Sequence, residues 1–334
     1  MKKIILIITL LLLTGCYNYR EISDLAIVSS FGIDYESYKY NIVLEILEND
    51  KNNKYSSYIL KGTGNTIESA LENASISFNK DLYFIDLDIL LISEGIVNYK
   101  LDDILNYISK NNNFSIDFNI AVCDNQEIII ESIKKKDEVF GTYIRSIYNN
   151  TNNNVLNIKF SKLLDNYLDH HYDIILPLYK IEDDVLLINE AIVMSNGLIA
   201  DSLNLEEVYI YNILNNNLKS YFIEIKDSNH LIFQTITYNT KYYFKKDTLY
   251  ILLSLSGTFN QNEKNVEELN MKINILFNQK VENLVNKLVK LKSDPLGLKK
   301  FLKGNDLENI NIRINSTIDS KNNNLIKEAF GGKS

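Results

Sequence analysis

The sequence predicts an α+β protein with two or three mixed domains, in which largely antiparallel sheets pack against helices. The chain has 334 residues, of which 46% are hydrophobic, so it can bury a sizeable core in more than one domain. Strand-like segments occur in groups, followed by single helices or by a group of helices. Because α/β proteins alternate strands and helices regularly, this order favours the α+β class.

The first part of the chain changes from strands to helices and back. Alternating patterns separated by polar, turn-like residues predict strands at 25–33, 40–47 and 55–61. The spacing then becomes helical, with apolar residues at Ile67, Ala70, Leu71, Ala74 and Phe78. We expect Asn65 to cap this helix, with Glu68 placed to close a capping box. Beyond it, the pattern predicts strands at 87–93 and 118–123 and a helix at 101–110.

Helical spacing dominates from residue 126 to about residue 168. Pro177, one of only two prolines, follows this region, and strands resume after it. The sequence therefore predicts an N-terminal α+β domain at 22–178, with a helical sub-region at about 126–170, and a C-terminal α+β domain at 179–334.

The C-terminal domain contains the clearest hairpin signal of the chain. Asn196-Gly197 stands between the apolar runs 191–194 and 198–200, which predicts a tight two-residue turn. The remaining expected elements are a helix at 205–214, strands at 221–225, 231–242 and 249–255, a short helix starting at Asp294-Pro295 and a final strand at 310–318.

A long amphipathic helix is predicted between the last strands. Its apolar face consists of Leu269, Ile273, Leu276, Phe277, Val281, Leu284, Leu288 and Leu291. A helix with one apolar stripe usually packs on its own sheet, so we expect core packing. Binding of a partner through this stripe is the alternative.

The first sixteen residues have the pattern of a lipoprotein signal. Lys2 and Lys3 precede an apolar run at 4–13, which is too short to span a membrane and suits a signal peptide. Leu13-Thr14-Gly15-Cys16 then resembles the bacterial lipobox. We expect cleavage of residues 1–15, lipidation of Cys16 and a tether at 16–21. An ordinary secretory signal followed by a chance cysteine is the alternative.

The charge of the chain bears on its partners. The formal net charge is −8, and removal of residues 1–15 loses two lysines and no acid, which makes it more negative. This balance argues against nucleic acid and against electrostatic docking of the protein on anionic lipid. Membrane lipid attached through Cys16 must therefore supply the anchoring, and two or three acyl chains, such as palmitate, hold more stably than one.

The sequence contains no recognisable catalytic, cofactor-binding or metal-binding constellation. Cys123 ends an apolar run and is interpreted as a small buried hydrophobe, because no histidine stands near it in sequence. The three histidines, His170, His171 and His230, lack the spacing of a metal site. Asp86 and Asp88 are expected on one face of a strand, where paired acids are usually solvated. We therefore predict that the protein is not an enzyme.

The residues after the expected anchor carry a family resemblance. Cys16-Tyr17-Asn18-Tyr19-Arg20-Glu21-Ile22-Ser23-Asp24-Leu25-Ala26-Ile27-Val28, followed by Phe31-Gly32-Ile33-Asp34, resembles the opening of the Ger(x)C spore germination lipoproteins. Further similar segments are Thr63 to Leu71, Leu87 to Glu94, Ala191 to Leu203 and Lys292-Ser293-Asp294-Pro295-Leu296-Gly297. Tyr17 and Asn18 depart from the usual Trp and Asp of that family. The similar segments follow the family order over nearly the whole chain.

This resemblance implies a partner role at the membrane. Family members are C subunits of nutrient germinant receptors and assemble with polytopic A and B subunits. The implied location is the outer face of the cytoplasmic membrane, which is the spore inner membrane. A solute-binding lipoprotein of a transporter is the main alternative, and it would have two similar α/β lobes around a cleft. A membrane-anchored wall hydrolase is a third possibility, and it would need a catalytic constellation.

Overall fold

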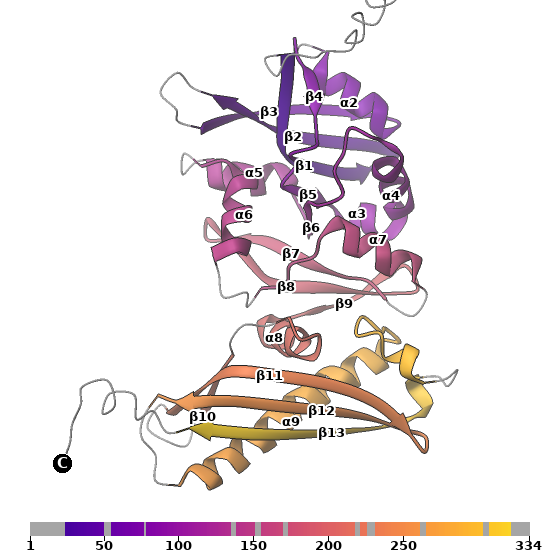
Figure 1. The fold of residues 1–334 in the computed structure, drawn as a ribbon. Coiled ribbons are helices and arrows are strands. Elements are labelled where there is room, and N and C mark those ends of the chain that lie inside the picture. Colours follow the sequence, from indigo (N-terminus) through magenta and orange to yellow (C-terminus); the bar gives the residue numbers. More distant parts are fainter. Residues whose placement is uncertain are drawn as a thin grey trace, which may run out of the picture.

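The protein consists of two sheets that follow one another along its length, with the helix α8 (Leu205–Leu214) between them (Figure 1). The computed structural model describes residues 24–49, 55–76, 78–134, 138–150, 155–169, 173–217, 221–225, 231–260, 265–302 and 307–321. Both sheets are mixed and pack against helices, so the predicted α+β class is confirmed.

The first sheet begins with an antiparallel meander. It has nine strands in the order β3-β2-β1-β5-β6-β7-β8-β9, with β4 paired to β1. The meander consists of β1 (Leu25–Glu36), β2 (Lys39–Asn49) and β3 (Tyr55–Gly64), and β4 is Asp81–Tyr83. The three strands predicted near the start of the chain are therefore confirmed, each a few residues longer than expected.

The centre of this sheet is parallel, which the sequence analysis did not predict. β1, β5 (Ile89–Ile92), β6 (Asn119–Cys123) and β7 (Ile175–Glu182) run in one direction. Helical crossovers connect them: α2 (Ile67–Ser75), α3 (Glu94–Tyr99), α4 (Leu101–Lys110), α5 (Gln126–Lys134), α6 (Phe140–Asn150) and α7 (Phe160–Leu168). Every residue of β5 and β6 is buried, as expected of parallel strands covered on both faces.

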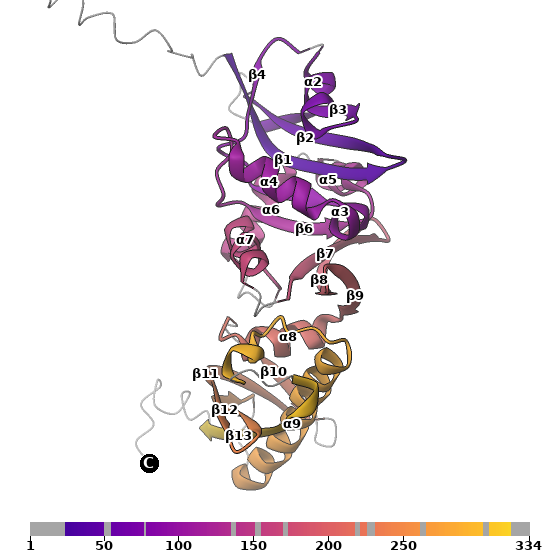
Figure 2. The same ribbon diagram turned by 90° about the vertical axis from the view of Figure 1, so that its right-hand side faces the viewer.

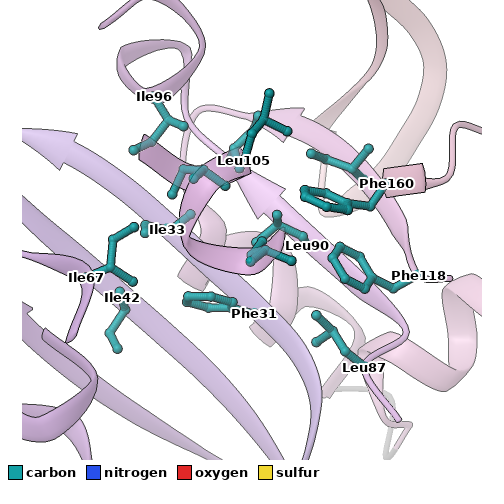
Figure 3. Packing of buried hydrophobic residues seen from close by; sticks show 14 of the residues in the cluster. Phe31, Ile33, Ile42, Ile67, Leu87, Leu90, Ile96, Leu105, Phe118 and Phe160 are labelled. Carbon is teal, nitrogen blue, oxygen red and sulfur yellow. The ribbon is translucent and has the colours of Figure 1, made fainter. Parts of the chain in front are cut away.

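Helices cover the two faces of this centre separately. On one face, α2 packs on β2 and β3, while side chains of α3, α4 and α7 lie over β1, β5 and β6, where Phe31, Leu90 and Phe118 meet Leu105 and Phe160 (Figure 3). On the other face, α5 and α6 cover alternate residues of the same strands. The strands therefore lie in the middle of three layers.

The sheet continues beyond the boundary predicted at residue 178. β8 (Val185–Ser195) and β9 (Leu198–Leu203) extend it, and Pro177 pairs with Ala191 inside the sheet instead of marking a seam. The predicted hairpin is confirmed: Asn196 and Gly197 form its turn with φ of 51° and 81°, in the left-handed region that this turn requires.

The second sheet has four strands in the order β10-β11-β12-β13. These are β10 (Phe222–Ile225), β11 (Leu231–Lys245), β12 (Thr248–Phe259) and β13 (Asn311–Lys321). The helix α9 (Val266–Lys290) links β12 to the parallel β13 and packs its apolar stripe on one face of the sheet. Core packing of the long helix is therefore confirmed.

Two local predictions were wrong. Thr66 caps α2, with Ser69 completing the capping box, instead of Asn65 and Glu68; the hydroxyl of Ser69 accepts from the Thr66 N–H and replaces the expected carboxylate. The segment after α9 becomes helical only at the short 3-10 helix η2 (Leu298–Phe301), because residues at 293–296 are held by other contacts described below. A second 3-10 helix, η3 (Leu307–Asn309), leads into β13.

Candidate functional site

Several residues singled out by the sequence lie outside the described part of the chain. These are the signal peptide, Cys16 with its tether, and the three histidines at 170, 171 and 230. Lipidation of Cys16 therefore stays a prediction at this point.

Cys123 is fully buried at the end of β6 and forms no disulfide. Burial raises the pKa of its thiol far above the ordinary value, because the low-dielectric interior disfavours the thiolate. The interpretation of Cys123 as a small buried hydrophobe is confirmed.

Asp86 and Asp88 do not share a strand face. Asp86 is exposed in a turn, whereas Asp88 is buried just before β5 and forms an ion pair with Arg145 on α6. Ser29 Oγ on β1 donates to Asp88 Oδ2 at 3.2 Å. Burial raises the pKa of Asp88, and the nearby Arg145 guanidinium offsets this only partly.

A second buried carboxylate, Glu45 on β2, binds the start of α6. Its side chain is completely buried and accepts hydrogen bonds from the backbone N–H groups of Phe140 (2.9 Å) and Gly141 (3.1 Å). It also accepts from the hydroxyls of Ser30 (2.7 Å) and Ser57 (3.0 Å). A carboxylate at a helix N-terminus satisfies N–H groups that have no partner within the helix.

The two carboxylates together attach α6 to the sheet. Gly141 permits the close approach, because a Cβ at this position would come within 2.2 Å of Ser29 Oγ. The sequence analysis missed this network. Its only sequence signal is an acid in the middle of the apolar run Ile42-Val43-Leu44-Glu45-Ile46, and nothing near it in sequence shows where its partners lie.

The segment Lys292 to Gly297, which follows α9, joins the two sheets. Ser293 Oγ donates to the Met194 carbonyl at 2.5 Å, and Ser195 Oγ donates to the Lys292 carbonyl at 3.2 Å. Both contacts bind the segment to the end of β8 in the first sheet. We call residues 292–297 and their partners the interdomain joint.

Asp294 is the most connected residue of the interdomain joint. Its backbone N–H donates to Asp173 Oδ2 at 2.7 Å, and the Asp173 N–H donates back to its carbonyl at 3.1 Å. Its buried carboxylate accepts from the N–H groups of Leu298 (2.8 Å) and Lys299 (2.7 Å) and so caps η2. Burial raises the pKa of Asp294. Because the Asp294 backbone bonds to Asp173, just before β7, while its carboxylate caps η2, the interdomain joint connects η2 to the first sheet.

An open cavity of about 720 Å³ lies between the start of α2 and α4. Within it, Tyr40 Oη donates to Asp103 Oδ2 at 2.7 Å, and Lys100 Nζ lies 3.0 Å from the same oxygen and 5.0 Å from the ring centre of Tyr35. The Tyr40 hydrogen bond lowers the pKa of Asp103. The cavity has the size of a small-molecule site. Its polar groups Tyr40, Asp103 and Lys100, however, already interact with one another.

The described residues contain neither a metal-binding cluster nor a membrane-spanning helix. No group of three or more His, Cys, Asp or Glu side chains among them is placed to hold a metal ion. None of their helices is long and apolar enough to cross a bilayer. The two sheets also differ in strand number and order, so the two similar lobes of a solute-binding protein are absent from these residues.

Two family models match the chain in sequence order. The one described as "Spore germination protein N-terminal domain" matches residues 18–181, and the one described as "Spore germination B3/ GerAC like, C-terminal" matches residues 189–323. The gap between them lies close to the boundary predicted at 178, whereas the hydrogen-bonded sheet crosses that boundary through β7, β8 and β9.

Individual proteins show the same relationship. "Spore germination protein GerQC" of Bacillus cereus is 21% identical over 322 residues, which is 90% of each chain. "Spore germination protein KC" of Bacillus subtilis (strain 168) is 26% identical over 153 residues, covering 41% of this chain and 37% of the relative. The crystal structure of the GerBC protein superposes with a TM-score of 0.52 and 11% identity over 87% of this chain and 96% of that chain, and it shows a shared fold.

Proposed function

The chain belongs to the family of spore germination proteins that these N- and C-terminal domain models describe, and we propose that it is the lipid-anchored C subunit of a spore nutrient germinant receptor. In this role it lies on the outer face of the spore inner membrane and assembles with the polytopic A and B subunits. It acts by binding its partners and not by catalysis.

One observation carries this proposal. The two domain models cover residues 18–181 and 189–323 in order, and the lipobox-like Leu13-Thr14-Gly15-Cys16 ends two residues before the first of them. An anchor at this position would hold the whole matched region outside the membrane. A Cys16 that carries two or three acyl chains would be sufficient for stable attachment to the membrane.

The anchor is tested by replacing each cysteine in turn. Cys16→Ala should abolish incorporation of labelled palmitate, move the protein out of the membrane fraction and impair nutrient-triggered germination. Cys123→Ala removes the other thiol and should leave all three readouts unchanged. Full germination with a soluble Cys16→Ala protein would show that the anchor is dispensable.

Assembly needs a separate test. The full-length protein, solubilised from spore membranes in mild detergent, should co-purify with polytopic receptor subunits, and deletion of its gene should abolish the response to the corresponding nutrient. The proposed role fails if germination is untouched by the deletion and no membrane partner co-purifies.

A further inference from the structure

A second open cavity, of about 620 Å³, lies where the junction of α3 and α4, the helix α7 and the β8–β9 turn meet. α7 contributes Asn166 and Tyr167 to its lining, and the β8–β9 turn contributes Gly197. In both Figure 1 and Figure 2, α7 lies on the side of α4 that faces α8 and the second sheet. The cavity shares Lys100 and Asp103 with the cavity described above and otherwise has its own walls. Its volume is within the range of small-molecule sites.

Asn166 is the residue of this cavity that indicates a ligand. The helix α7 buries Phe160 and Leu163, and Asn166 continues this buried stripe at the same spacing of three residues. Asn166 is only 8% exposed and lines the cavity, and no described residue forms a hydrogen bond with its side-chain amide. Buried amides normally have hydrogen-bond partners, so Asn166 offers a carbonyl oxygen and an NH₂ group to a molecule that fills the cavity.

The walls around Asn166 are acidic. The lining carboxylates are Asp102, Asp103, Asp169 and Asp173. Lys100 Nζ lies 3.0 Å from Asp103, and Lys299 Nζ lies 3.4 Å from Asp173. Four carboxylates against these two ammonium groups leave an excess of two negative charges among the described residues. The cavity therefore attracts a positively charged ligand.

Asp102 and Tyr167 bond to each other across the cavity. Tyr167 Oη donates to Asp102 Oδ1, and this hydrogen bond raises the pKa of the tyrosine, so its hydroxyl stays protonated. In the described part of the chain, no group donates to the other oxygen of this carboxylate, Oδ2. Asp102 Oδ2 is therefore available to accept from a ligand, and the ring of Tyr167 adds an electron-rich face of the kind that ammonium groups favour.

The rest of the lining distinguishes an organic cation from a metal ion. Val97, Leu101, Ile174 and Met194 line the cavity and are buried, so they offer an aliphatic surface to an alkyl chain. A metal ion instead needs several ligands around one point. Within the described residues, no three or more acidic side chains, histidines or cysteines are placed together in this way. Acidic groups beside an aliphatic surface therefore match a cation that carries a hydrocarbon chain.

We propose that this cavity binds a small aliphatic amine, with one or two primary ammonium groups on an alkyl chain. Its ammonium groups donate to Asp102 and to the carbonyl oxygen of Asn166, and its chain lies against the aliphatic lining. A primary ammonium group fits these acceptors better than a quaternary one, because only the primary group has N–H donors. A basic side chain of a protein partner has similar chemistry, but the burial of Asn166 favours a molecule that enters the cavity completely.

Calorimetric titration of the purified full-length protein with 1,5-diaminopentane tests this site. At about 0.15 M salt, charges further apart than about 8 Å are largely screened, so general attraction to the acidic chain is weak. We expect saturable binding at one site. The uncharged 1,5-pentanediol has the same chain length and should not bind.

Three variants locate the site. Asp102→Asn keeps the shape of the side chain and removes its charge, so it should weaken diamine binding about 10-fold or more. Asp165→Asn is the matched control, because Asp165 is an exposed acid on α7 that does not line the cavity, and it should leave the affinity unchanged. Asn166→Leu extends the apolar stripe of α7, so we expect it to fold, as checked by urea unfolding, and to weaken binding about 10-fold through loss of an acceptor.

Four results would overturn the proposal. The first is no binding of the diamine at concentrations up to about 10 mM. The second is equal binding in Asp102→Asn and Asp165→Asn, which would indicate general attraction to the acidic chain. The third is equal binding of 1,5-pentanediol, which would show that the cavity does not recognise charge. The fourth is loss of a co-purifying receptor subunit in Asp102→Asn without diamine binding by the unmodified protein, which would show that the cavity receives a protein partner. The titration involves neither the membrane nor other subunits, so its failure leaves the proposed receptor role intact.

Discussion

Replacing Glu45 by alanine tests whether a buried carboxylate holds the start of α6 against the nine-stranded sheet. The change removes the acceptor of four hydrogen bonds and leaves the N–H groups of Phe140 and Gly141 without that partner. Ser57 is only partly buried, so water can replace its bond, whereas Ser30 is completely buried.

The expected loss of stability follows from these contacts. Each buried donor left without an acceptor costs about 1–3 kcal/mol, and removal of the buried charge returns part of its desolvation penalty. We therefore expect Glu45→Ala to lower the free energy of unfolding by about 3–5 kcal/mol. Glu45→Gln keeps the shape and one carbonyl acceptor, so about half of that loss is expected.

Two measurements distinguish the loss of the Glu45 hydrogen bonds from a nonspecific loss of stability. Urea unfolding of the purified protein reports the change in stability, with the exposed Glu48 on the same strand replaced by alanine as the control. Hydrogen exchange of a peptide covering 138–150 reports the start of α6 directly, and its amides should exchange faster in Glu45→Ala. If Glu45→Ala unfolds like Glu48→Ala, within about 0.5 kcal/mol, and exchange at 138–150 is unchanged, the reasoning is refuted.

The remaining predictions concern the second carboxylate, the interdomain joint and the buried thiol. Arg145→Leu leaves Asp88 buried without its cation and should destabilise the protein by about 2–4 kcal/mol near neutral pH. Because the folded-state pKa of Asp88 is already raised, this loss of stability should shrink as the pH falls towards the ordinary range of a carboxyl, as measured by urea unfolding between pH 7 and 5. Asp88→Asn in the same chain should recover part of the lost stability. Ser293→Ala removes the hydroxyl that donates to the end of β8 and should lower the free energy of unfolding by about 1–2 kcal/mol. It should also make the unfolding of the two sheets less cooperative in calorimetry. An unchanged single transition would show that the interdomain joint does not couple the two sheets. Cys123 should resist a thiol reagent in the folded protein and react on unfolding in urea, and rapid labelling without urea would show that β6 opens.

Local sequence patterns were sufficient for most elements of the fold. The helix at 101–110 was predicted with the bounds of α4, which buries Leu101, Ile104, Leu105 and Ile108 at helical spacing. The helix at 205–214 was predicted with the bounds of α8, which begins with a capping box between Asn204 and Glu207. The turn at Asn196-Gly197 depends on two adjacent residues that tolerate positive φ, so it could also be predicted locally.

The parallel centre of the first sheet could not be predicted in this way. β5 and β6 are continuous apolar runs, and such runs are compatible with either strand direction. Their pairing depends on the crossover helices between them, and the order of strands in a sheet is a long-range property. The sequence analysis therefore placed β1, β5 and β6 but missed both β7, where Pro177 was interpreted as a seam, and the arrangement of these strands.

The sequence alone carries local patterns. These are the spacing of apolar residues, the lipobox-like segment ending in Cys16 and the motifs that resemble the spore germination family. Only the tertiary structure decided which distant residues meet. It placed Glu45 and Asp88 against α6, Ser293 against the end of β8, and Tyr167 beside Asp102. The physical reason is that hydrogen bonds and ion pairs depend on distances of a few ångströms, and strand register and crossover packing set those distances between residues far apart in the chain.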